Sequence, residues 1–468
     1  MITTISNDIK IQDPTKEIID WCNTWLVLDN PLYKQLKVMG KEDTIRYRHI
    51  PEKINLYGKS GTKLILPFGL LRSVWDMIKI GQVVTSFNKT DDISIVKDKP
   101  TIEFYDYQNK AIQAMVKAKG GVLVASCGAG KTIMGIELIH SIGKKALWLT
   151  HTADLLRQAK EDMLELYPNI KIGVTTDGKL EIGEDVTIST IQTLVNIDSE
   201  LYKNEFEVII CDESAHVCGS PTQYKMFTKI LSIVPARYKF GLTATPTRAD
   251  GMIKAMYAYL GTSQSGLFEP TYKVDRSEVK TLTAVHNKFE LATKYNEFNM
   301  WEIYDTSGMI VYNKLIDSLS NNEERNQIIL HNIVECSKQG RKQVVLTLRV
   351  EHCEYLVEEL NKRGVKAVLC VGKTTAKNRT AILNQKVEWE VLVATYALLK
   401  EGVSIKELDT LHMVTPVKEK GMVIQCAGRI ERYLEGKKQP IVWDYVDTDI
   451  PYCEKAFNSR RRALKKRF

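Results

Sequence analysis

Two series of short, uninterrupted apolar segments constrain the fold of this chain more than any other feature. The first series falls between residues 122 and 243 and the second between residues 344 and 445, and helical patterns separate the segments. Strands that are apolar on both faces are typical of parallel sheets covered by helices. The sequence therefore predicts two α/β domains in tandem. The segments are residues 122–125, 146–149, 186–189, 208–211 and 240–243, then 344–348, 367–371, 391–394, 411–414 and 441–445.

The length of the chain leaves room for a third, smaller domain. At roughly 150 residues per domain, 468 residues predict about three domains. The first part mixes helix and strand patterns, which favours an α+β domain, and the polar stretch 88–100 is typical of a linker. We therefore expect an N-terminal accessory domain at 1–95, α/β domains at 101–265 and 266–450, and a basic tail at 451–468.

Composition narrows the class of protein. No apolar run approaches the roughly 20 residues of a membrane helix, and the first residues lack a signal-peptide pattern. The nine cysteines form no CxxC pair and the eight histidines form no HExxH motif, which disfavours disulfides and structural metal. We expect a cytoplasmic protein that acts as a monomer.

The charge balance permits a polyanionic partner. The net charge is +8, and basic residues gather at the C-terminus. This cluster is interpreted either as a solvated tail or as an arm that contacts phosphates. It comprises Arg460, Arg461, Arg462, Lys465, Lys466 and Arg467.

A glycine-rich turn follows the first strand of the first series and opens an apolar helix. Strand, turn and helix in this order are the context of a phosphate-binding loop. Gly128 and Gly130 allow the backbone to approach phosphates, Lys131 would reach the β- and γ-phosphates of ATP, and the Thr132 hydroxyl would ligate Mg²⁺. The candidate nucleotide contacts are Ser126, Cys127, Gly128, Ala129, Gly130, Lys131 and Thr132.

Two acids, Asp212 and Glu213, end a later strand of the same series. This position places them at the carboxyl edge of the sheet, where α/β proteins bind ligands. Asp212 would hold Mg²⁺, and Glu213 would orient and deprotonate the attacking water. The loop and the acids together predict a site for ATP hydrolysis.

A third group of candidate catalytic residues lies in the second series. Gln425, Arg429 and Arg432 stand at i, i+4 and i+7, which places them on one face if the segment is helical. Arginine suits the stabilisation of charge on a transferring phosphoryl group, because its charge is permanent and its fork matches phosphate oxygens. Taken alone, the pattern also fits a charged surface face with intrahelical pairs to Glu431.

These motifs, in this order, resemble those of superfamily 2 helicases of the DExH type. Residues 212–216 resemble the DExH box with Ala215 in the histidine position, so His216 either couples hydrolysis to movement or is a structural histidine. The resemblance implies coupling roles for Thr243 and Thr245, an adenine contact by Gln108, and a nucleotide contact by Gly402. It also implies two RecA-like domains, with ATP bound by both and Mg²⁺ as its metal.

The resemblance further implies contacts with a nucleic-acid strand. Hydroxyls, amides and arginines bind phosphates without reading bases. For each residue alone, a solvated or helix-capping role explains the sequence equally well. The candidates are Arg157, Thr190, Gln192, Arg349, Lys373 and Thr374.

Residues 440–447 and the basic C-terminus look like the XPB- and UvsW-type branch, which includes phage branch-migration helicases. The leading hypothesis is a DNA helicase that remodels branched DNA, in the cytoplasm of an infected bacterium if the phage likeness holds. The alternatives are an RNA helicase or transcription-release translocase, a scaffold with a silent ATPase, and the translocating subunit of a restriction system.

Overall fold

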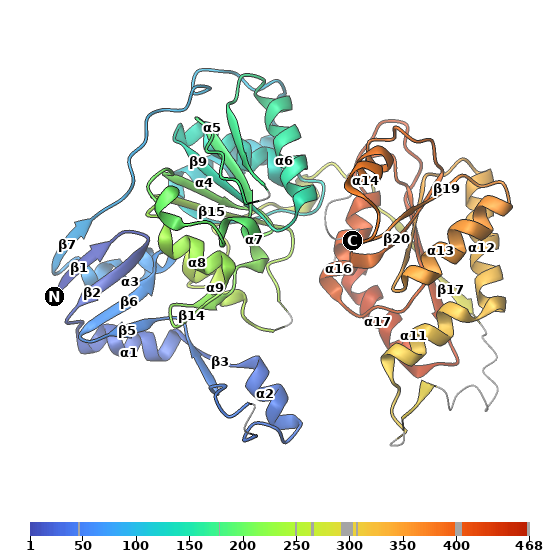
Figure 1. Cartoon of the computed structure of the whole chain (residues 1–468), viewed down its shortest axis with the longest axis horizontal. Coiled ribbons are helices and arrows are strands. Elements are labelled where there is room, and N and C mark those ends of the chain that lie inside the picture. The colour runs from blue at the N-terminus through green and yellow to red at the C-terminus, as the bar shows by residue number, and fades with distance from the viewer. Residues whose placement is uncertain are drawn as a thin grey trace. The chain divides into compact units, whose positions relative to one another are not determined.

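The chain folds into two compact units, Met1–Glu278 and Val279–Phe468. The computed structural model describes residues 1–44, 47–176, 178–248, 250–263, 266–291, 303–305, 308–397 and 405–465. Each unit contains a parallel sheet with helices packed against it (Figure 1). The first unit also contains a smaller mixed sheet, which confirms the predicted α/β fold with an N-terminal α+β domain.

The N-terminal domain is a five-stranded sheet in the order β5-β6-β2-β1-β7 with two helices beside it. Thr15 caps the first helix by accepting a hydrogen bond from the Ile18 amide, and Asn30 caps α2, where proline follows at the first helical position. The strands are β1 (Ile2–Ile5), β2 (Asp8–Gln12), β5 (Gly58–Ser60), β6 (Lys63–Pro67) and β7 (Gln82–Thr85), the helices are α1 (Lys16–Trp25) and α3 (Leu71–Ile78), and an arm holds β3 (Val27–Asp29), α2 (Pro31–Val38) and β4 (Lys53–Asn55).

The N-terminal domain shares a core with the first α/β domain. Ala255 and Ala258 of α9 (Ile253–Leu260) pack among its apolar side chains. Gly69 lies so close to this helix that an added Cβ would meet the Tyr257 carbonyl oxygen at 2.7 Å. The buried Lys239 amine donates to the Asn7 and Leu231 carbonyls, at 3.0 and 2.8 Å. These contacts explain why both domains form one unit.

The sheet of the first α/β domain has the strand order β10-β11-β9-β12-β15-β8-β16, and every neighbouring pair is parallel. All five apolar segments predicted for this domain lie on its strands. The strands are β8 (Gly120–Val124), β9 (Ala146–Thr150), β10 (Ile172–Thr175), β11 (Val186–Thr190), β12 (Val208–Cys211), β15 (Tyr238–Thr243) and β16 (Tyr272–Lys273). The other elements are α4 (Asp106–Ala118), α5 (Lys131–Ile142), α6 (Ala153–Leu166), α7 (Ile191–Leu194), α8 (Met226–Ile233) and the hairpin β13 (Gly219–Ser220)–β14 (Gln223–Tyr224).

The structure differs from the expected boundaries of this domain at two places. The short strand β16 pairs with β8, so the first unit continues to residue 278 instead of ending at 265. The polar stretch 88–100 is bonded along the domain rather than being a free linker. Asn88 donates to the Phe206 carbonyl at 2.9 Å, and the Ser94 hydroxyl donates to the Asp185 carboxylate at 2.6 Å.

The second unit is built on a six-stranded sheet in the order β17-β22-β21-β18-β20-β19, again with only parallel pairs. Its predicted apolar segments all lie on strands. The strands are β17 (Val285–Leu291), β18 (Gln343–Thr347), β19 (Ala367–Cys370), β20 (Val391–Thr395), β21 (Thr410–Met413) and β22 (Ile441–Asp447). The helices are α11 (Tyr312–Asn321), α12 (Glu323–Lys338), α13 (Val350–Lys362), α14 (Ala376–Leu383), α16 (Lys420–Ile430) and α17 (Pro451–Lys465).

The expected basic tail is instead the helix α17, which packs against α16 and β22. Arg460 is buried and forms a two-pronged ion pair with Asp444, with a shortest distance of 2.6 Å from Nη2 to Oδ1. The interpretation of Arg460 as a phosphate contact was therefore wrong, because its guanidinium is enclosed by the second unit. Arg461 and Arg462 are exposed, whereas Lys466 and Arg467 lie outside the described residues.

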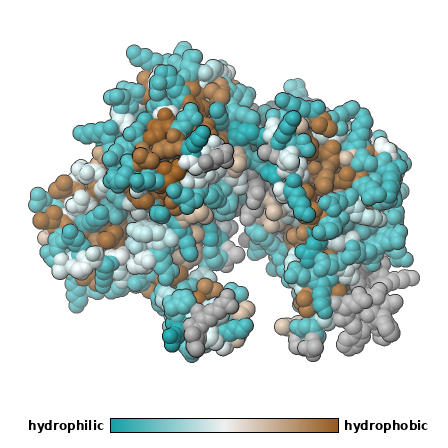
Figure 2. All heavy atoms as spheres, viewed as in Figure 1, coloured by the Kyte–Doolittle hydropathy of each residue, from teal (hydrophilic) through white to brown (hydrophobic). Residues whose placement is uncertain are grey.

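Within the described part of the chain, no helix is both long and apolar enough to cross a membrane. The face shown in Figure 2 is largely hydrophilic, with hydrophobic residues gathered in separate patches.

Candidate nucleotide site

The glycine-rich loop joins the end of β8 to the start of α5. The Ala125 amide donates to the Thr243 carbonyl at 3.0 Å, which ties the loop to the end of β15. Gly128 and Gly130 have φ angles of 85° and 77°, in the left-handed region that favours glycine. At Gly130 a Cβ would lie 2.5 Å from Gln108 Nε2. Both glycines are therefore needed for the shape of the loop.

The loop fits a phosphate group. Its backbone leads into the N-terminus of α5, where amide groups lack helical partners and favour an anion. The Ser126 hydroxyl is buried and has no hydrogen-bond partner among the described residues. Lys131 and Thr132 begin the helix and remain partly accessible. A bound phosphate would supply the missing partner of Ser126.

Gln108, the predicted adenine contact, lies beside the loop. Its side-chain amide donates to the Ala129 carbonyl at 3.1 Å, and its oxygen accepts from the Tyr105 amide at 3.0 Å. A glutamine amide has two donors and can accept two hydrogen bonds, so one donor and one acceptor position remain for adenine. The parallel rings of Tyr105 and Tyr107, 5.7 Å apart, stand next to it.

Asp212 and Glu213 follow β12 directly, at the carboxyl edge of the sheet. Asp212 is buried, and its burial, together with the charge of Glu213, raises the pKa of its carboxyl group, while nearby Lys131 lowers that pKa. The Glu213 amide donates to Asp212 Oδ1 at 2.9 Å, and Glu213 has an unusual φ of 47°. Adjacent acids, of which Asp212 is buried and Glu213 half-buried, fit a divalent cation, which would offset their repulsion. Asp212 with Thr132 would hold that Mg²⁺.

His216 lies against a histidine that the sequence had not singled out. The rings of His216 and His151 stack with centroids 4.2 Å apart and planes 8° apart. His151 directly follows β9, whereas His216 lies in the loop after Asp212, so the contact joins two strand ends. Sequence spacing offers no signal for a pair 65 positions apart along the chain.

A second unexpected link joins the acidic loop to the segment after β15. Arg248 Nη1 donates to the Ala215 carbonyl at 2.8 Å, while its other nitrogens bind Asp250 at 2.9 and 2.6 Å. In the same segment the Thr245 amide donates to the Thr243 hydroxyl at 3.2 Å. The two threonines predicted to couple hydrolysis to movement are thus held between the glycine-rich loop and the acidic loop.

The arginine motif of the second unit begins on α16. Gln425 and Arg429 share one face of this helix, and Gln425 Oε1 and Arg429 Nε are buried without a partner among the described residues. The helix ends at Ile430, so the expected single helical face does not extend to Arg432. The backbone of Arg432 instead forms an isolated antiparallel β-bridge with Thr281. Its carbonyl accepts a hydrogen bond from the Lys437 amine at 2.9 Å. The predicted nucleotide contact Gly402 lies outside the described residues.

Comparison with known families decides the identity of these motifs. A model described as type III restriction enzyme, res subunit, matches residues 101–248, and one described as helicase conserved C-terminal domain matches residues 324–433. Together they match more than half of the chain. The chain belongs to the superfamily 2 helicases. Its helicase core therefore binds ATP, and such cores bind it typically with Mg²⁺.

Several proteins are similar to this helicase. A protein provisionally described as an ATP-dependent RNA helicase of Acanthamoeba polyphaga mimivirus is 26% identical over 76% of the chain, and a provisionally described helicase of Escherichia phage T5 is 28% identical over 68%. The chain spans 66% of each of these two relatives. An XPB-type DNA 3'-5' translocase of Sulfurisphaera tokodaii is 24% identical over 72% of the chain and 80% of the relative. The solved structure of T4 UvsW is 18% identical, covers 100% of this chain and 98% of its own, and has a TM-score of 0.43.

The predicted nucleic-acid contacts of this helicase differ in how they are held. Arg157 lies 3.4 Å from Asp154, and Arg349 lies 2.6 Å from Asp317, so both arginines already have acidic partners. The Thr190 hydroxyl caps α7, and the Thr374 hydroxyl accepts from the Val371 amide at 3.0 Å. The side chains of Gln192 and Lys373 are exposed. All six contacts remain predictions.

Proposed function

We propose that this helicase couples ATP hydrolysis to translocation on DNA and remodels branched DNA, by branch migration, fork reversal or R-loop removal. The observation that carries the ATP-hydrolysis part of the proposal is a pair of buried polar atoms on α16. Gln425 Oε1 and Arg429 Nε lack partners within the described part of their own unit. Buried polar groups without a partner are unfavourable, so they favour a ligand that completes them. In this proposal, that ligand is the ATP bound by the glycine-rich loop.

The roles of the residues follow from their chemistry. Lys131 and the amides at the start of α5 bind the phosphates, Thr132 and Asp212 hold Mg²⁺, and Glu213 orients the attacking water. When bound, Mg²⁺ neutralises charge on the phosphate oxygens.

The second unit completes the proposed site. Gln425, Arg429 and Arg432 stabilise the charge on the transferring phosphoryl group. Because the two units supply different groups, ATP favours one arrangement of the units and its hydrolysis releases that arrangement.

We favour DNA over RNA as the nucleic acid on which the protein translocates for two reasons. One similar protein is named a DNA 3'-5' translocase, and the chain spans most of its length. The N-terminal domain is packed onto the first helicase domain, where it can engage a duplex next to the translocated strand. An RNA helicase is the second candidate, because the mimivirus relative is named as one.

The experiment measures ATP turnover with a panel of nucleic acids: linear duplex, fork, four-way junction, duplex RNA and RNA–DNA hybrid. Forks and junctions should stimulate turnover most. Glu213→Gln should retain ATP binding yet lower turnover by about 10²- to 10⁴-fold, since it removes the general base. Stronger stimulation by RNA than by any DNA would favour the RNA helicase. No measurable ATP turnover with any of these nucleic acids would favour the scaffold with a silent ATPase instead.

A further inference from the structure

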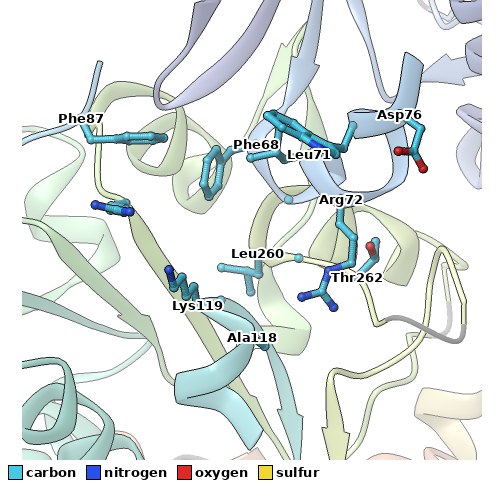
Figure 3. Close-up of a pocket in the computed structure, with 14 residues that line it drawn as sticks. Phe68, Leu71, Arg72, Asp76, Phe87, Ala118, Lys119, Leu260 and Thr262 are labelled. Atoms are coloured by element: carbon cyan, nitrogen blue, oxygen red, sulfur yellow. The ribbon is translucent and has the colours of Figure 1, made fainter. Parts of the chain in front are cut away.

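A pocket of about 580 Å³ lies where the N-terminal domain meets the first α/β domain. One wall comes from α3 and the turn before it, and the other comes from residues 118–120 and 260–262 and from Arg237. In Figure 3 Arg72 extends from the first wall toward Thr262, and Lys119 enters from the second. Neither wall belongs to the nucleotide site.

Three cations without ion-pair partners line this pocket. Arg72, Lys119 and Arg237 are exposed, and none of them has a side-chain hydrogen bond or salt bridge to the described residues. The one acid in the lining, Asp76, instead accepts a hydrogen bond from Lys79. Other exposed lysines of this unit do have acids beside them, as Lys34 has Asp29 at 2.5 Å. The pocket therefore has an uncompensated positive charge that suits an anion.

Aromatic rings stand beside the cations. Phe68 and Phe87 meet edge to face, with centroids 5.6 Å apart, and Trp75 is 43% exposed. Because its indole is accessible, Trp75 contributes less to the stability of the fold than a buried tryptophan would. Cations beside accessible aromatic rings form the combination that binds a strand of nucleic acid, because the cations follow the phosphates and bases stack on the rings. An acidic peptide would use the charge but not the indole.

The backbone at the rim supports a functional role for Lys119. This residue has a φ of 59° at the end of α4, a left-handed conformation that glycine adopts readily and that a residue with a side chain adopts at a cost of about 1 kcal/mol. Gly120 and Gly121 follow it directly. A lysine at this position places an amine at the mouth of the pocket despite the unfavourable backbone.

The pocket and the nucleotide site lie at opposite edges of one sheet. Strand β8 starts at Gly120, in the pocket lining, and ends at Val124, just before the glycine-rich loop. Five residues of strand span about 17 Å. The segment of nucleic acid that lies in the pocket is therefore too far from the glycine-rich loop to contact the phosphates of ATP.

We propose that this pocket is a second nucleic-acid site, which holds a phosphodiester segment among Arg72, Lys119 and Arg237 and stacks a base on Trp75. The inference rests on the proposed function and names a contact that belongs to the N-terminal domain. It gives this domain a means to hold one arm of a branched molecule.

The test follows the salt dependence of binding by fluorescence anisotropy, with full-length protein and forked DNA. The variant changes Arg72, Lys119 and Arg237 to glutamine. Each lost phosphate contact should lower the slope of log affinity against log salt by about 0.9 on duplex or 0.7 on a single strand, so the triple variant should lose about 2.1 to 2.7. A matched control neutralises three exposed lysines of the same unit, Lys16, Lys97 and Lys99, and should lose less than one.

A slope equal to that of the control would overturn the inference. The three single variants, each expected to lose about one third of the change, keep the test valid if the triple variant does not fold. Trp75→Ala should weaken binding about fivefold or more for a fork with a single-stranded arm and leave a blunt duplex unaffected. An equal loss of affinity for the fork and for the blunt duplex would contradict the stacking of a base on Trp75.

The same titration with an RNA fork separates this inference from the proposed function. If the wild type prefers RNA, the DNA assignment fails, and the pocket is then judged by the loss of slope on RNA. Inorganic phosphate as a competitor distinguishes a strand from a small anion. Displacement of the fork by millimolar phosphate at constant ionic strength would contradict the claim that the pocket binds a nucleic-acid strand.

Discussion

Buried histidines of the second unit show how single residues set the conditions under which this protein is stable. His352 lies between the Thr347 hydroxyl and the Asn326 amide oxygen, each at 2.9 Å. His412 lies between Tyr445 and Gln343, at 3.1 and 2.8 Å. Burial lowers the pKa of both imidazoles from 6.5 to about 3. Both are therefore neutral in the folded protein near neutral pH.

Acid should destabilise the second unit for this reason. The unfolded chain protonates each histidine near pH 6.5, whereas the folded protein does so only near pH 3. The contribution of the two neutral histidines to the free energy of unfolding is therefore complete above pH 6.5. It is lost as the pH falls toward 3, by about 1.4 kcal/mol per pH unit for each histidine. Urea unfolding at pH 7.5, 6.0 and 5.0 measures the slope of the free energy of unfolding against pH.

Replacement of a single histidine isolates its share of this slope. His412→Gln should be less stable at every pH but should lose about half of the slope below pH 6.5. The exposed His331 of the same unit provides the control, since His331→Gln should keep the full slope. An unchanged slope in His412→Gln would contradict the assignment of the acid sensitivity to this residue.

At the scale of elements, the strands were predictable because their apolar segments are buried on both faces. The glycine-rich loop was predictable because its glycines are needed for left-handed angles. Strand β16 escaped prediction, since two residues such as Tyr272 and Lys273 have no periodicity to detect. The link of Arg248 to the Ala215 carbonyl and the stacking of His151 on His216 depend on tertiary contacts between separate strand ends.

Helix α17 shows the limit of reasoning from charge. Three consecutive arginines predict exposure, yet the helix places Arg460 against Asp444 and leaves Arg461 on the surface. Arg460→Ala should lower the free energy of unfolding by about 3–5 kcal/mol, because it leaves a buried carboxylate without a partner. The matched variant Arg461→Ala should change it by about 0.5 kcal/mol or less.

Thermal unfolding of both variants provides the measurement. Equal unfolding temperatures for the two would show that the buried pair contributes little. Deletion of the C-terminus from residue 460 onward would not test phosphate contacts, because it also removes this pair from the core.

At the scale of the whole molecule, the proposed function divides the chemistry of one reaction between two units. The first contains the glycine-rich loop and the two acids, and the second contains the arginine motif. Under this proposal, neither unit alone supplies all the groups that act in phosphoryl transfer. If both act on the same ATP, hydrolysis changes how the units are arranged, and a strand held by both units moves.

Single-turnover ATP hydrolysis by Arg429→Ala and Arg432→Ala, with forked DNA bound, tests this claim most directly. We predict that ATP affinity stays within a few fold of wild type, since the first unit binds the phosphates, while hydrolysis slows by about 10³-fold or more, as expected for lost arginine fingers. Hydrolysis at the wild-type rate in both variants would contradict the claim that the second unit acts on the ATP held by the first.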